Sequence, residues 1–194
     1  MKTQNILNLM IWIVEIYFVH LQKIIIMVFT EKDYKEARMI AIQAHGLQTY
    51  DEIYPYVKHI DDVVDVLRRF GYSGKYIISA YLHDIIEDTA LSYNKVKGRF
   101  GIEVAEMVYC VTDELGRNRA EKKVKTLPKT ASNPNAIELK LGDRIANIEH
   151  GGKIDMYAKE YGQFHGALFL NTPKDGLVMW NHLEKLLELE VEEV

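Results

Sequence analysis

Apolar side chains recur every three or four residues along most of the chain from residue 30 onward, with charged side chains between them. This spacing is typical of helices that bury one face. In the segment IDDVVDVLRRF, the shared apolar face consists of Ile60, Val63, Val64, Leu67 and Phe70. Helices of this kind are predicted over residues 60–70, 75–86, 135–149, 154–169 and 175–190. The alternation of apolar and polar residues that marks half-buried strands is missing from the sequence, so the pattern predicts an all-α fold.

Residues that start and stop helices refine these boundaries. Thr30 and Asp33 have the spacing of a capping box at the start of a helix. Ser92 is the expected N-cap of a short helix that ends near Gly98, and Gly101 opens a further helix. The signals therefore divide the middle of the chain into two consecutive helices.

The segment before this helical region is far more apolar than the rest of the chain. Read as a membrane span, residues 6–29 are interrupted by Asn8, Glu15, His20, Gln22 and Lys23. Read as a secretory signal, the segment lacks a small-residue cleavage site. Three interpretations of residues 1–29 stay open: a spurious or dispensable extension before a start at Met27, a membrane-associated helix, or a helix docked on the core. The chain is expected to consist of this extension and one domain over residues 30–194.

Composition narrows the class of protein. Hydrophobic residues make up 48 % and charged residues 27 % of the 194 residues, which is ordinary for a globular protein. The single cysteine, Cys110, excludes an internal disulfide framework and a CxxC zinc module, and it suits a reducing compartment. The formal net charge of −4 argues against nucleic acid as the partner. The oligomeric state is left open.

Two histidines and two aspartates form the pattern that points to chemistry: His59, the adjacent pair His83-Asp84, and Asp143. Both aspartates fall in apolar predicted helices, where an ionised carboxylate is costly unless it is paired or bound to a metal. Two imidazoles and two carboxylates are a mixed donor set suited to Mn, Fe, Zn, Co or Ni. Four protein ligands leave room on an octahedral cation for water and a substrate oxygen, so the pattern predicts a hydrolytic metal site.

An acidic pair, Glu87-Asp88, follows the His-Asp pair. On a continuous helix, Glu87 would lie one turn after Asp84 and on the same face. A carboxylate in that place can deprotonate an attacking water and later protonate a leaving oxygen. The alternative is that the pair only marks the end of the helix before Thr89. Its position beside His83-Asp84 favours the catalytic interpretation.

A second polar stretch, residues 113–134, is expected to be irregular and is strongly basic in its middle. Its cations are Arg117, Arg119, Lys122, Lys123, Lys125 and Lys129. A run of this kind is a solvated face in many proteins. Beside a metal site it could instead hold a polyanionic substrate. On this second interpretation we expect Arg119, Lys122 and Lys123 to contact substrate phosphates.

Four segments carry a family resemblance: PYVKH (55–59), YLHDIIEDT (81–89), RFGIEVAEMVYCVTDE (99–114) and LKLGDRIANIE (139–149). In this order they resemble the HD-domain hydrolases. Within that family the sequence is most similar to the RelA/SpoT-type ppGpp hydrolase domain and the small stand-alone SpoT homologues. The resemblance covers about residues 30–150 and implies an HD-domain helical bundle around a mononuclear metal site, closed by the C-terminal helices.

The resemblance also implies residue roles. The ligands of the metal, which is Mn in the family, would be His59, His83, Asp84 and Asp143. Glu87 and Asp88 would activate water, and Asn147 would contact the nucleotide sugar. Arg144 would have a structural role.

The stretch after the first helix departs from the family pattern. The family reads AHxxQxR, with the Arg packed on the purine base, whereas this chain reads AHGLQTY (44–50) and places Tyr50 at that position. A phenol can stack on a purine but carries no charge. Asp51 and Glu52 replace the basic and Ser-Gly residues that follow in the family. Gly142 replaces the family alanine before the last metal-binding aspartate, at a small cost in helix propensity.

Three functions are compatible with these features. The first is a metal-dependent pyrophosphohydrolase acting on a nucleotide 3′-diphosphate such as ppGpp. The second is an HD-type phosphatase or phosphodiesterase acting on another nucleotide, which the altered loop keeps open. The third is a non-catalytic nucleotide-binding HD module, against which the acidic pair speaks. In each case the expected partner is a small-molecule nucleotide and the expected location is the cytoplasm, with membrane contact only through residues 1–29.

Overall fold

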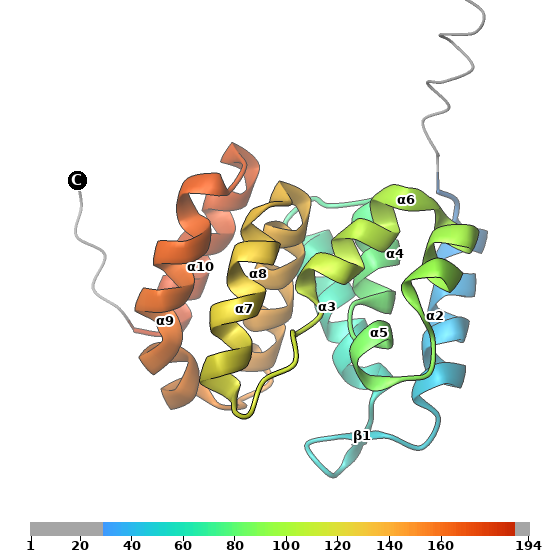
Figure 1. Ribbon diagram of the computed structural model, residues 1–194, viewed down its shortest axis with the longest axis horizontal. Helices are drawn as coiled ribbons and strands as arrows, with labels where there is room; N and C mark the ends of the chain where they lie inside the picture. Colours follow the sequence, from blue (N-terminus) through green and yellow to red (C-terminus); the bar gives the residue numbers. More distant parts are fainter. Residues whose placement is uncertain (1–28, 189–194) are drawn as a thin grey trace, which may run out of the picture.

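The computed structural model describes residues 29–188, and these are almost entirely helical (Figure 1). The helices are α2 (Glu31–His45), α3 (Val57–Arg69), α4 (Lys75–Leu82), α5 (Ile85–Asp88), α6 (Tyr93–Val111), α7 (Arg119–Ala131), α8 (Pro134–Glu149), α9 (Ile154–Leu168) and α10 (Leu177–Leu186). Two 3-10 turns, η1 (Phe169–Asn171) and η2 (Lys174–Gly176), precede α10. The predicted all-α fold is confirmed. The apolar extension up to residue 28 lies outside the described residues. The last predicted helix, over 175–190, is too long, because α10 begins at Leu177 and ends at Leu186 and is followed by a turn; residues 189 and 190 lie outside the described part of the chain.

Helix α8 forms the middle of the bundle and packs against α3, α4, α6, α7, α9 and α10. In Figure 1, α9 and α10 lie on one side of α7 and α8, and α2, α4, α5 and α6 lie on the other. The α8 side chains Leu139, Leu141 and Ile145 are completely buried. None of the helices within residues 29–188 is both long and apolar enough to cross a lipid bilayer.

The predicted caps at Thr30 and Ser92 agree with the structure, whereas the helix predicted from residue 60 begins earlier, at Val57. The backbone N–H of Thr30 donates to Asp33 Oδ2 over 2.8 Å, as in a capping box. Ser92 is the N-cap of α6, and the two helices expected on either side of Gly101 join across a kink at that residue. Gly101 has φ +88°, a conformation that glycine adopts without strain.

The prediction of one continuous helix over residues 75–86 is wrong, because the chain breaks at His83-Asp84. Helix α4 ends at Leu82 and α5 begins at Ile85. His83 Nδ1 lies 2.8 Å from the carbonyl oxygen of Ala80, which would accept from the amide of Asp84 in a continuous helix. The imidazole therefore occupies the acceptor that helix continuation needs, and the His-Asp pair sits at a junction.

The prediction that residues 113–134 are irregular is also wrong, because α7 occupies most of this stretch. The side chain of Asn118 caps α7 by accepting from the backbone N–H of Glu121 over 2.9 Å. Glu121 in turn pairs with Arg117 and Lys125. All the basic residues of this stretch except Arg117, which precedes the cap, are thus part of a capped helix. The stretch between α2 and α3 contains a short antiparallel hairpin of β1 (Thr49–Tyr50) and β2 (Tyr54–Pro55).

Gly142 marks a close approach of α3 and α8. A Cβ atom at this position would lie 2.9 Å from Cδ2 of the completely buried Leu67. We expect Gly142→Ala to lower the free energy of unfolding by about 1–2 kcal/mol, because overpacking outweighs the gain of about 1 kcal/mol in helix propensity.

Urea denaturation measures this effect, and Gly162→Ala is the matched control. A Cβ at Gly162 on α9 meets nothing within 4 Å, so this variant should be more stable than the wild type by about 1 kcal/mol. Equal stabilisation by both substitutions would contradict the close approach.

Candidate metal centre

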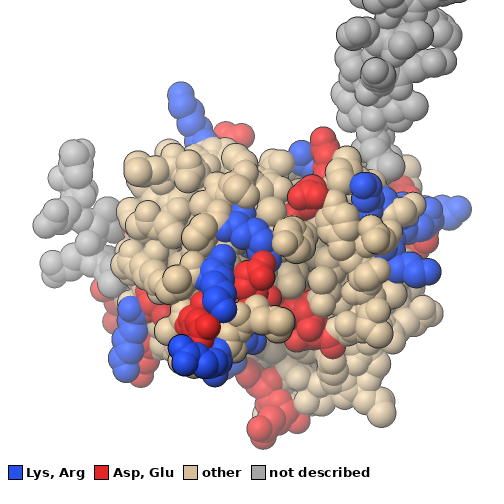
Figure 2. Space-filling model, viewed as in Figure 1, with Lys and Arg blue, Asp and Glu red and all other residues tan. Residues whose placement is uncertain are grey.

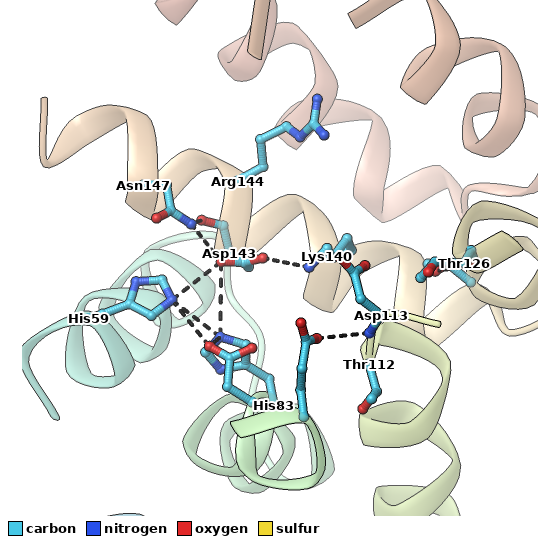
Figure 3. A network of polar contacts seen from close by, with 12 residues as sticks. His59, His83, Thr112, Asp113, Thr126, Lys140, Asp143, Arg144 and Asn147 are labelled. Carbon is cyan, nitrogen blue, oxygen red and sulfur yellow. Dashed lines mark hydrogen bonds and ion pairs between the residues drawn. The ribbon is translucent and has the colours of Figure 1, made fainter. Parts of the chain in front are cut away.

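Three packed segments bring the His and Asp side chains of the predicted metal site together. His59 lies on α3, His83 and Asp84 lie between α4 and α5, and Asp143 lies on α8. Helix α3 packs against both α4 and α8 through its apolar face, so the polar side chains at this junction converge in the middle of the bundle. Asp143 lies between His59 and Lys140, with Asn147 beside it (Figure 3).

The four side chains form one cluster, in which His59, His83 and Asp143 are buried and Asp84 is partly buried. The Nε2 atoms of His59 and His83 are 3.2 Å apart. His59 Nε2 lies 3.3 Å from Asp143 Oδ1, and His83 Nε2 lies 2.8 Å from Asp84 Oδ2. One ligand atom from each of His59, His83 and Asp143 lies within 4.8 Å of the other two. Asp84 joins them through its contact with His83 and a 3.8 Å approach to His59 Nε2.

The orientation of His83 suits metal binding. Its Nδ1 can only donate to the carbonyl oxygen of Ala80, 2.8 Å away, so a neutral ring carries its lone pair on Nε2. That lone pair faces His59 and the two aspartates. His59 is held from the other side by Tyr50, whose ring stacks on the imidazole with 4.8 Å between centroids.

The carboxylates make the cluster strongly attractive to positive charge. Burial opposes a charge on His83, but Asp84 and Asp143 outweigh it and raise the pKa of His83 to about 9. Burial likewise opposes ionisation of Asp84, yet the neighbouring His83 holds its pKa below the usual value. A divalent cation at the Nε2 and Oδ atoms would satisfy both aspartates and both imidazoles, so the donor set fits such a cation.

Lys140 belongs to the site although it was not predicted. Its Nζ donates to Asp143 Oδ2 over 2.8 Å, which leaves Oδ1 as the oxygen that faces His59. Burial opposes the charge on Lys140, but Asp143 and Asp84 outweigh it and raise the pKa of the ammonium. A lysine three residues before an aspartate on one helix is a recognisable signal, because side chains at that spacing are neighbours.

Glu87 and Asp88 flank the cluster but point to different partners, because α5 is a separate turn. Glu87 Oε2 accepts from the backbone N–H of Asp113 over 2.8 Å. Asp88 Oδ2 lies 3.3 Å from the hydroxyl of Tyr56, which also donates to Asp84. Partial burial is the largest cause that raises the pKa of both Glu87 and Asp88. A carboxylate with a raised pKa is a stronger base, which suits a group that exchanges protons with water.

Tyr50 and Asn147 are linked to each other beside the cluster. The Tyr50 hydroxyl donates to Asn147 Oδ1 over 2.9 Å. Asn147 Nδ2 donates to the carbonyl oxygen of Asp143 over 2.9 Å and to Asp143 Oδ1 over 2.7 Å. Both ends of the Asn147 amide are therefore engaged by the protein. The nucleotide contacts expected of Tyr50 and Asn147 stay predictions.

The basic residues of α7 are mostly paired with acidic residues. Arg119 binds Glu160 and Lys123 binds Asp113, whereas Lys122 forms no ion pair within residues 29–188. In Figure 2, the Lys and Arg side chains in this part of the surface alternate with Asp and Glu side chains. The phosphate contacts expected of Arg119, Lys122 and Lys123 stay predictions. Arg119 and Lys123 are already paired with carboxylates.

Arg144 packs in the core, away from the ligand cluster. Its guanidinium lies 3.7 Å from the centroid of Phe164 and 4.8 Å from that of Tyr157. A 3.4 Å contact with Glu160 completes its surroundings. These contacts join α8 to α9, in agreement with the structural role that the resemblance implies.

The fold and the cluster define an all-α protein with a His and Asp donor set at the centre of a bundle. The chain belongs to the HD domain family, which matches residues 37–155. This membership and the cluster together imply a divalent metal ion.

Two curated relatives are similar over part of their length. A guanosine-3′,5′-bis(diphosphate) 3′-pyrophosphohydrolase of Aquifex aeolicus is 36 % identical over 123 residues, which is 61 % of this chain and 18 % of that protein. A bifunctional (p)ppGpp synthase/hydrolase SpoT of Escherichia coli is 31 % identical over 130 residues, 63 % of this chain and 18 % of that protein. The chain therefore matches less than a fifth of the length of these relatives.

Solved structures share the fold. One, described as a metazoan ortholog of SpoT that hydrolyzes ppGpp, has a TM-score of 0.65 at 21 % identity and covers 84 % of this chain and 99 % of its own. A second, from Listeria monocytogenes, has a TM-score of 0.53 at 20 % identity and covers 69 % of this chain and 96 % of its own. At these identities the likeness concerns the fold alone.

Proposed function

We propose that this chain is a metal-dependent phosphohydrolase that releases pyrophosphate from the 3′ position of guanosine 3′,5′-bis(diphosphate). The observation that carries the proposal is the convergence of two imidazoles and two aspartates in one cluster in the middle of the bundle, with Glu87 and Asp88 beside it. The activity named for the Aquifex aeolicus relative supports this choice of substrate. With a nucleotide substrate of this kind, the proposed location of the activity is the cytoplasm.

The proposed metal is Mn²⁺, held by His59, His83, Asp84 and Asp143. A mixed set of imidazole nitrogens and carboxylate oxygens suits Mn²⁺, and four protein ligands leave positions for water and substrate. When bound, such a cation supplies Lewis-acid chemistry at the phosphoryl group and acidifies water. Lys140 holds Asp143 in a single orientation by binding its Oδ2 atom.

The acidic pair carries the proton transfers in this proposal. Glu87 accepts the proton of the attacking water, and its fixed contact with the amide of Asp113 sets the direction of the carboxylate. Asp88 shares the Tyr56 hydroxyl with Asp84 and is the second carboxylate available for these proton transfers. Phosphate contacts are assigned to Arg119 and Lys122, and contacts with the nucleoside to Tyr50 and Asn147.

A substrate panel with Mn²⁺ tests the function. The panel comprises ppGpp, pppGpp, deoxynucleotide monophosphates, cyclic nucleotides and NADPH. Pyrophosphate release from ppGpp and pppGpp alone is the expected result. The second candidate is a phosphatase or phosphodiesterase for another nucleotide. It is favoured by Asp51 and Glu52 at the tip of the hairpin, because two carboxylates suit a substrate with less negative charge than a bis(diphosphate). Release of phosphate from a monophosphate would replace the first proposal by the second.

Two substitutions of Tyr50 test its place in nucleoside binding. Tyr50→Phe keeps the ring and frees Asn147 Oδ1 to accept from a sugar hydroxyl, so KM for ppGpp should fall by about two- to tenfold. Tyr50→Ala removes the stacking surface and should raise KM by a similar factor. Neither change should alter the salt dependence of KM, because the phenol is uncharged. An unchanged KM in both variants would show that the nucleoside binds elsewhere.

A further inference from the structure

The turn that follows α6 is fastened to α7 by four polar contacts. Lys123 Nζ donates to both carboxylate oxygens of Asp113, over 2.8 and 2.9 Å. The backbone N–H of Glu114 donates to Thr126 Oγ1 over 2.8 Å, and Lys129 Nζ donates to Glu114 Oε1 over 2.6 Å. Lys125 Nζ donates to the carbonyl oxygen of Leu115 over 2.7 Å. Three lysines of the basic segment therefore hold the turn at residues 113–115.

The Asp113–Lys123 pair is the most deeply buried of these contacts. Both side chains are 9 % exposed, so the ammonium has little access to a ligand in solution. Burial lowers the pKa of Lys123, whereas this lysine outweighs burial at Asp113 and lowers the pKa of its carboxyl. A paired ammonium at this depth fixes its partner more firmly than an exposed ion pair does.

Asp113 connects Lys123 to Glu87: its side chain binds Lys123, and its backbone binds Glu87. The N–H of Asp113 donates to Glu87 Oε2 over 2.8 Å. Asp113 lies next to Lys140 on the side of the cluster that faces α7 (Figure 3). Glu87 itself sits on α5, a helix of one turn, so contacts from outside that helix decide where its carboxylate points.

We infer that Lys123 is a positioning residue: its ion pair with Asp113 fixes the backbone amide that aims Glu87 at the metal-ligand cluster. This inference rests on the proposed function, in which Glu87 accepts a proton. It assigns Lys123 a role different from the phosphate contact expected from the sequence. A phosphate contact acts on substrate binding, whereas a positioning residue acts on turnover.

Lys123→Met separates these two roles, because methionine keeps an apolar chain of similar length without the charge. The positioning role predicts that kcat for ppGpp falls about 10- to 100-fold while KM and its salt dependence stay as in the wild type. Lys97→Met is the matched control, since Lys97 is exposed on α6 and its ammonium forms no hydrogen bond or ion pair within residues 29–188. A raised KM at unchanged kcat would overturn the inference.

Hydrogen exchange at the Asp113 amide, followed by NMR without substrate, gives a readout that is independent of activity. Lys123→Met should speed this exchange at least about tenfold, and Lys97→Met should leave it unchanged. If the wild type releases no pyrophosphate from ppGpp, the proposed function fails. Slow exchange at the Asp113 amide that depends on Lys123 would still show that Lys123 fixes this amide. Exchange at the wild-type rate in Lys123→Met would overturn that hold whatever the substrate is.

The double variant Asp113→Asn/Lys123→Met covers the case in which Lys123→Met does not fold. It leaves no buried charge without a partner, and replacing both members of a buried pair is tolerated better than replacing one. The expected result is a folded protein with faster exchange at residue 113 and a lower kcat at unchanged KM. Wild-type exchange and kcat in this variant would overturn the inference.

Discussion

Asp143→Ala is expected to leave the protein without its divalent cation and to lower kcat/KM for ppGpp about a thousandfold. The substitution removes the carboxylate that lies 3.3 Å from His59 Nε2. It also leaves the ammonium of Lys140 without its partner at 2.8 Å, so a positive charge then faces the two imidazoles. Loss of Lewis-acid stabilisation worth several kcal/mol corresponds to an effect of about this size.

Elemental analysis of the purified proteins measures the metal content directly. Asp155→Ala is the control, because Asp155 is an exposed carboxylate on α9 outside the cluster. Adding Lys140→Met to Asp143→Ala should restore part of the metal content, since it removes the unpaired ammonium. Equal metal content in the wild type and Asp143→Ala would show that the cluster does not hold the cation.

Glu87→Gln should lower kcat by about two to four orders of magnitude while the metal stays bound. The amide keeps the shape of the side chain and can still accept from the N–H of Asp113, but it cannot take up a proton. Metal content and KM are therefore expected to stay within about threefold of the wild type, because neither a metal ligand nor a phosphate contact is removed. Unchanged turnover would mean that the acidic pair only ends the helix.

The pH dependence of kcat gives a second readout for Glu87. Burial raises the pKa of Glu87, and a base must be deprotonated to act, so the acid limb of the wild-type profile should lie above the usual pKa of a glutamate. That limb should disappear in Glu87→Gln. Glu103→Gln on α6, which changes an exposed glutamate paired with Lys75, should keep the wild-type profile.

Much of the fold could be predicted because helical periodicity and capping residues are local signals. The capping box at Thr30 and the interruption at Gly101 are both readable from the sequence. The break at His83 is not, because it depends on a side chain that binds the Ala80 carbonyl in place of a backbone amide. The helix over 119–131 was missed because its polar, proline-containing sequence hides the capping pair of Asn118 and Glu121.

The His and Asp side chains of the cluster could be singled out from the sequence because a carboxylate among apolar residues requires a charged partner or a metal, and their role as metal ligands stays a prediction. The residues that orient the cluster were harder to find. Asp113 reaches the site from a segment whose relation to it is set only by tertiary packing, and Tyr56, at the start of α3, reaches Asp84 across the packed helices. For Arg119 and Lys123 of α7, the sequence reveals the charge but not the carboxylate that neutralises it. Their partners lie far along the chain, at Glu160, or across a turn, at Asp113.

The separation of the cluster in sequence ties its occupancy to the folding equilibrium. His59, His83 and Asp143 belong to three different segments and meet only when α3, α4 and α8 pack together. The unfolded chain has no such preformed donor set, so any free energy gained by ligand binding at the cluster is added to the free energy of unfolding. Each tenfold rise in the concentration of a saturating cation would therefore stabilise the folded chain by about 1.4 kcal/mol. The free energy of unfolding, measured over a range of cation concentrations, would thus also report the affinity of the site for the cation.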